Sequence, residues 1–100
     1  MTLAADIPLL HRFQLFVAGD AANSLQAVAN LSAMCKAHLP DGYQIEVVDV
    51  FKQPKRALAE GIFMTPTLLR MAPVPIRKIV GSLSQIKVLL QALGLEGATA

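Results

Sequence analysis

The most reactive side chains in this chain are a cysteine and a histidine three residues apart. Cys35 and His38 lie in an apolar, helix-like run, where a spacing of i, i+3 puts them on neighbouring turns and could offer two ligands to zinc. A structural zinc site needs four ligands, and His11 is the only other histidine. We therefore expect no metal site, a buried Cys35 and a surface His38.

Other catalytic groups lack partners in the sequence. Asp49 ends an apolar run with Glu46 nearby, but no second converging group or base completes an acid–base pair. Phosphate-binding loops and catalytic triads have no match. We expect neither a catalytic residue nor a cofactor. The single cysteine and the absence of a signal-peptide pattern near Met1 favour the cytoplasm.

Prolines are the next conspicuous group. Pro66 stands between two threonines after an apolar run, and Pro73 and Pro75 precede a strand-like run with two adjacent cations. The bond before proline has two isomers that differ by about 0.5–1 kcal/mol and interconvert over tens of seconds or longer. These prolines could set a slow conformational step. Alternatively, they only shape turns and protect a sheet edge.

Composition and charge limit the partners of the chain. The 100 residues are 54% hydrophobic and 16% charged, which favours apolar surface and oligomerisation, but no apolar run approaches the roughly 18 residues that span a bilayer. Residues 50–90 carry seven cations against Glu60, a net charge of +6, and the remainder carries −4. The cations are Lys52, Lys55, Arg56, Arg70, Arg77, Lys78 and Lys87. Since no aromatic residues interleave with them, an acidic protein partner is favoured over nucleic acid, and a solvated basic face remains an alternative.

The hydrophobic pattern predicts an α/β fold in one domain, residues 1–100, with flexible ends at 1–11 and 95–100. Expected strands and helices cover residues 13–17, 23–39, 44–50, 54–60, 68–71, 76–80 and 86–93. The first helix is expected to begin at a cap on Asn23 or Ser24 and to bury Leu25, Val28, Leu31, Cys35 and Leu39. The last segment fits both the helical and the strand period.

The order βαβ–α–ββ–α, with Pro66 entering the third strand, is the thioredoxin-like arrangement. Dithiol catalysis in that arrangement needs Cys-x-x-Cys where the first strand meets the first helix. Residues 19–24 contain no cysteine, so a dithiol enzyme is excluded. One enzymatic alternative remains, in which Ser24 and the backbone beside Pro66 hold glutathione.

Four stretches of this sequence, in unbroken order, closely resemble the KaiB family of circadian clock proteins. They are residues 13–19 with Asn23-Ser24, residues 47–54, residues 65–68 and residues 73–81. The resemblance runs from about residue 12 to residue 93.

The resemblance implies a non-enzymatic, metamorphic protein. A ground state, βαββααβ, would form a homotetramer or dimer. A switched monomer, βαβαββα, would bind the KaiC ATPase ring, compete with the kinase SasA and sequester KaiA, driving KaiC toward dephosphorylation. By the same resemblance, Pro66, Pro73 and Pro75 are the fold-switch prolines. Partner binding would use Lys52, Arg77 and Lys78.

Departures from the family pattern leave alternatives within it. Val74 replaces the middle one of three consecutive prolines, and residues 94–100 replace an acidic tail. These differences favour a paralogue that works with a KaiC homologue without KaiA, as in a simpler timer or a stress response. The sensory domain of SasA is a second alternative, although no kinase follows here.

Overall fold

The computed structural model describes residues 10–95, which fold in the order βαβαββα. The elements are β1 (His11–Val17), α2 (Ala22–His38), β2 (Tyr43–Asp49), α3 (Pro54–Ala59), β3 (Thr67–Ala72), β4 (Arg77–Val80) and α4 (Ile86–Ala92). This order confirms the thioredoxin-like prediction and is the order that the resemblance assigns to the switched state. Of the expected flexible ends, residues 1–9 and 96–100 lie outside the described residues, whereas His11 begins β1.

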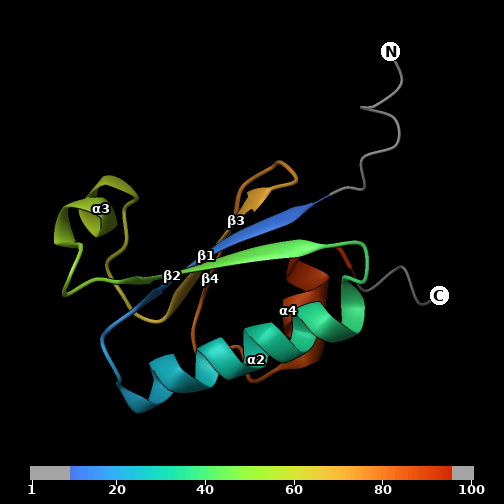
Figure 1. Ribbon diagram of the computed structural model, residues 1–100, viewed down its shortest axis with the longest axis horizontal. Helices are drawn as coiled ribbons and strands as arrows, with labels where there is room; N and C mark the ends of the chain where they lie inside the picture. Colours follow the sequence, from blue (N-terminus) through green and yellow to red (C-terminus); the bar gives the residue numbers. More distant parts are fainter. Residues whose placement is uncertain (1–9, 96–100) are drawn as a thin grey trace.

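The four strands form one mixed sheet in the order β2-β1-β3-β4. β1 is parallel to β2, and α2 supplies the crossover between them; β3 is antiparallel to both β1 and β4. α2 and α4 cover one side of the sheet, and the short α3 lies on the other (Figure 1). Neither α2 nor any other helix in residues 10–95 is long and apolar enough to cross a membrane.

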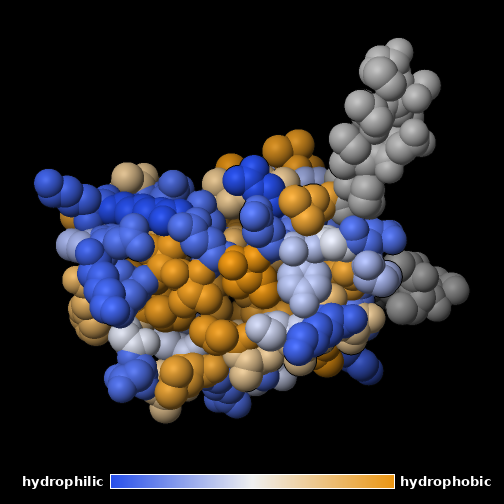
Figure 2. Space-filling view, viewed as in Figure 1, coloured by the Kyte–Doolittle hydropathy of each residue, from blue (hydrophilic) through white to orange (hydrophobic). Residues whose placement is uncertain are grey.

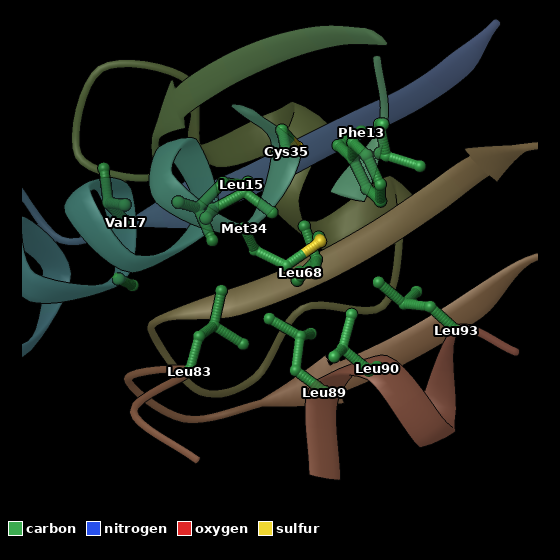
Figure 3. Packing of buried hydrophobic residues seen from close by; sticks show 13 residues of the cluster. Phe13, Leu15, Val17, Met34, Cys35, Leu68, Leu83, Leu89, Leu90 and Leu93 are labelled. Atoms are coloured by element: carbon green, nitrogen blue, oxygen red, sulfur yellow. The ribbon is translucent and has the colours of Figure 1, made fainter. Parts of the chain in front are cut away.

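Two hydrophobic clusters hold these layers together, and Figure 2 shows hydrophobic residues reaching the surface between α2 and the sheet. The larger joins alternate residues of β1 to α2, β3 and α4, and Figure 3 shows Leu83, Leu89 and Leu93 pointing from the α4 side toward the sheet. The smaller lies under α3 and consists of Phe16, Val48, Ala57, Ile62 and Leu69. The alternation of β1 between the two clusters follows from the two-residue period of a strand.

The predicted cap of α2 and the predicted burial of Leu25 are wrong, whereas the predicted burial of Leu31, Cys35 and Leu39 is confirmed. Its N-cap is Ala21, without a side-chain hydrogen bond, because the Ser24 hydroxyl points inward and accepts a bond from the Ala18 N–H at 3.1 Å. Leu25 is 58% exposed. The buried residues are Ser24, Ala27, Leu31, Met34 and Cys35, a helical stripe rotated away from Leu25.

The last segment, which fitted two periods, is the helix α4. Leu89 and Leu90 are buried on the sheet, and Leu93 is buried at its C-cap, whereas Ile86 and Val88 are largely exposed. As a helix, this segment buries three leucines against β1, α2 and β3. This tertiary contact explains why it is a helix although its sequence also fits the strand period.

The three prolines are not gathered in one place. Pro66 is buried just before β3, whereas Pro73 and Pro75 lie in the turn after it, at the opposite end of that strand. The peptide bonds before all three are cis.

A candidate partner-binding surface

An apolar surface lies where the parallel strands β1 and β2 end. Its lining residues are Ala18, Val50, Phe51, Ile62, Phe63, Met64 and Thr65, around a shallow hollow of about 230 Å³. Phe51, Phe63 and Met64 are 74%, 86% and 64% exposed, respectively. We call these seven residues the apolar end surface. Exposed aromatic and methionine side chains gathered in this way are typical of a protein-binding site.

Asp49 positions Phe51 on this surface. Its Oδ1 accepts a hydrogen bond from the Phe51 N–H at 2.9 Å and another from the Gly19 N–H at 3.2 Å. The carboxylate therefore ties the β2–α3 loop to the β1–α2 turn. Gly19 has a φ of +54° and lies beside the Phe51 ring, so the turn combines a left-handed backbone with a close aromatic neighbour. Asp49 thus has a structural role here.

The loop before β3 presents Phe63 and Met64. Ile62 anchors one end of the loop in the cluster under α3, with only 7% of its surface exposed. The Thr67 hydroxyl fixes the other end by donating to the Met64 carbonyl at 2.6 Å. Phe63 and Met64 lie between these anchors and face solvent, so their exposure results from a restrained loop.

The three predicted partner-binding cations are divided between two sides of the molecule. Lys52 is exposed in the loop next to Phe51. Lys78 reaches the same region, since its Nζ donates to the Gly61 carbonyl at 3.0 Å, beside Ile62. Arg77 is the cross-strand neighbour of Arg70 and lies on the opposite face of β4. Arg77 and Lys78, although adjacent in the sequence, therefore lie on opposite faces of the sheet.

The cations of α3 differ in their pairing. Arg56 forms a two-pronged ion pair with Glu46 of β2, and this hydrogen-bonded partner lowers the pKa of Glu46. Lys55 is exposed and forms no ion pair in residues 10–95. Lys52 and Lys78 therefore supply positive charge beside the apolar end surface, whereas Arg56 is compensated within the chain.

Thiol or metal chemistry in this chain would depend on Cys35, His38 or Ser24. Cys35 is fully buried, and burial raises the pKa of its thiol to about 11, so it stays protonated near neutral pH. His38 is exposed, as predicted. Ser24 is only 2% exposed, and its hydroxyl is bonded to the Ala18 N–H, which removes the group that the glutathione alternative needs. Residues 10–95 contain no cluster of three His, Cys, Asp or Glu side chains.

Phe51, Phe63 and Met64 are not among the functional residues that the sequence predicts. A signal for two of them was present: Phe63-Met64 are apolar residues in a stretch too short to be a helix or a strand, directly before Thr65-Pro66. Large apolar side chains in a loop that a proline and a buried isoleucine restrain are candidates for contact with a partner.

The fold, together with a β1–α2 turn that lacks cysteine, defines a thioredoxin-like protein without the dithiol. Two solved structures share this fold. Chloroplastic thioredoxin z superposes with a TM-score of 0.69 at 16% identity, covering 96% of this chain and 85% of its own. The N-terminal domain of SasA from Synechococcus elongatus superposes with a TM-score of 0.68 at 25% identity, covering 87% and 84%.

Residues 14–95 match the family model described as the KaiB domain. The circadian clock protein KaiB3 of Synechocystis sp. is 40% identical over 83 residues, which are 83% of this chain and 79% of that protein. The chain belongs to the KaiB family of circadian clock proteins.

Proposed function

We propose that this chain is a non-enzymatic clock or timer component that binds the ring of a KaiC-type ATPase as a monomer and promotes the ring's dephosphorylation phase. Family membership over residues 14–95 supports a clock role. The observation that carries the binding proposal is the apolar end surface, on which Phe51, Phe63 and Met64 are exposed in a fold without the dithiol.

The chemistry of the surface indicates what the partner presents. Burial of Phe51 and Phe63 requires an apolar groove or helix face on the ATPase. Lys52 and Lys78 flank this apolar centre, so acidic side chains are expected at the rim of the partner site. Screening by salt would slow such association, because rim charges act mainly on the rate of encounter.

Competition with a SasA-type kinase is part of the proposal. The likeness to the N-terminal domain of SasA supports it, since two proteins of one fold can present similar surfaces to one ring. In a host that has KaiA, the bound state would also sequester it. The replacement at Val74 favours a timer or stress-response system that lacks KaiA.

A second state of the chain is also proposed. In it the chain would adopt the order βαββααβ as a homotetramer or dimer in the cytoplasm, and Pro66, Pro73 and Pro75 would belong to the half that refolds. The support is the family resemblance of residues 65–81.

Size-exclusion chromatography with light scattering tests this proposal. The chain is measured alone and then with the KaiC-type ATPase of the same genome and ATP, and the phosphorylation of the ATPase is followed in parallel. We expect monomers of the chain to co-elute with the ring and to speed its loss of phosphate. A ring that never co-elutes with the chain would refute the binding proposal, and unchanged phosphorylation despite binding would refute the regulatory one.

A further inference from the structure

Arg70 is a buried cation that joins two segments separated along the chain. It is 6% exposed, on the face of β3 that α4 covers. Its Nη1 donates to the carbonyl of Leu93, the C-cap of α4, at 2.8 Å, and its Nη2 donates to the carbonyl of Pro75 in the β3–β4 turn at 2.8 Å. One guanidinium thus bridges the end of α4 and the proline turn.

Helix geometry explains why a cation is buried here. The last carbonyls of a helix have no partner within the helix, and the C-terminal end carries partial negative charge. Arg70 forms no ion pair in residues 10–95, and its buried Nε has no hydrogen-bond partner. The two carbonyls are therefore its main compensation for burial, and the bridge is sensitive to nearby charge.

Arg77 supplies that nearby charge. It lies opposite Arg70 in the register of β3 and β4, so both side chains project from the same face of the sheet. Burial, together with the positive charge of Arg77, lowers the pKa of Arg70. Like charges directly opposite each other on neighbouring strands are destabilising. Arg77 is exposed, so a partner's carboxylate can reach it and cancel the repulsion.

We propose that Arg77 controls how firmly α4 is docked, with Arg70 as the positioning residue that transmits its charge. An acidic group bound at Arg77 removes the repulsion, strengthens the bridge from Arg70 to Leu93 and Pro75, and so secures the C-terminal end of α4. This inference concerns the isolated chain and does not depend on the proposed ATPase partner.

Hydrogen exchange of the α4 amides tests the inference, with the Leu93 N–H, which donates to the Leu89 carbonyl, as the main probe. Arg77→Gln should slow exchange of this amide roughly two- to five-fold, the range expected for a cross-strand charge pair. Lys78→Gln is the matched control, because it removes the same charge from the next residue on the opposite face. It should leave α4 unchanged.

Arg70→Met provides the second arm of the experiment. It retains an apolar stem but removes both hydrogen bonds, so exchange at Leu93 should accelerate at least about ten-fold. Adding Arg77→Gln to Arg70→Met should then have no further effect on α4. The inference is overturned if Arg77→Gln slows exchange equally in the absence of Arg70, if Lys78→Gln has the same effect, or if Arg77→Gln changes nothing.

Discussion

Removal of the Phe63 side chain should weaken binding of the ATPase without weakening the fold. Phe63 is 86% exposed and contributes no buried surface to either hydrophobic cluster. Phe63→Ala should therefore change the free energy of unfolding by no more than about 0.5 kcal/mol.

The effect on binding follows from the exposed area. A phenylalanine can bury roughly 200 Å², so the exposed part of Phe63 is about 170 Å². At about 25 cal/mol per Å² its complete burial would contribute at most about 4 kcal/mol. Costs of ordering and association lower this figure, and alanine retains part of the contact. We expect a loss of about 2 kcal/mol, which is roughly 30-fold in Kd.

Isothermal titration calorimetry against the ATPase ring with ATP measures this change, and urea unfolding checks stability. Val74→Ala is the matched control, because Val74 is 79% exposed but lies in the β3–β4 turn, at the far end of β3 from Phe63. It should bind as the unmodified chain does. Equal Kd values for the unmodified chain and Phe63→Ala would show that the apolar end surface is not the binding site. Equal losses of affinity for Phe63→Ala and Val74→Ala would show that the binding site extends beyond the apolar end surface.

Three further predictions concern the described core. Burial and the charge of Arg70 lower the pKa of His11 below its ordinary value of 6.5, so the unfolded chain binds more protons between the two pKa values. The free energy of unfolding should therefore fall as pH drops through this window and level off above it; urea midpoints should show this, and His11→Gln should remove the contribution. Cys35→Ala should cost about 1 kcal/mol through lost packing and leave partner binding intact, and loss of binding by a folded variant would revive a role for the thiol. Leu83 is 8% exposed and has a φ of +64°. Leu83→Ala should destabilise the fold by about 2–5 kcal/mol through lost burial. Leu83→Gly should destabilise it by about 1 kcal/mol less than alanine does, because glycine adopts the left-handed backbone without strain. Thermal unfolding of both Leu83 variants would contradict this reasoning if glycine were the worse substitute.

The order of elements could be predicted because local patterns agree with the tertiary fold in most of the chain. Alternation in residues 13–17 identified β1, and Pro54 marked the start of α3. The segment of α4 could not be assigned from its own residues, since they fit both periods. Its burial depends on the surface that β1, β3 and α2 provide, which no local pattern describes.

The positions of the partner-binding cations were harder to predict from the sequence than the fold. The adjacent cations Arg77 and Lys78 were expected to act together, but a strand sends neighbouring side chains to opposite faces. Arg70 was counted among the basic residues available to a partner, yet it is buried between α4 and the proline turn. Charge counts do not distinguish a cation that binds the chain itself from one that meets solvent.

The uncapped start of α2 makes the chain a natural starting point for protein engineering. Within residues 10–95, no side chain accepts a hydrogen bond from the first N–H groups of α2, because Ala21 is the N-cap and Ser24 points inward. A thiol introduced there as Ala21→Cys would meet the positive end of the helix, which favours the thiolate. The same chain would then hold one cysteine that resists alkylation, Cys35, and one that reacts with iodoacetamide near neutral pH. The reactivity of a thiol in this variant would therefore depend on its position along α2, and the protein could be labelled at a single, chosen cysteine.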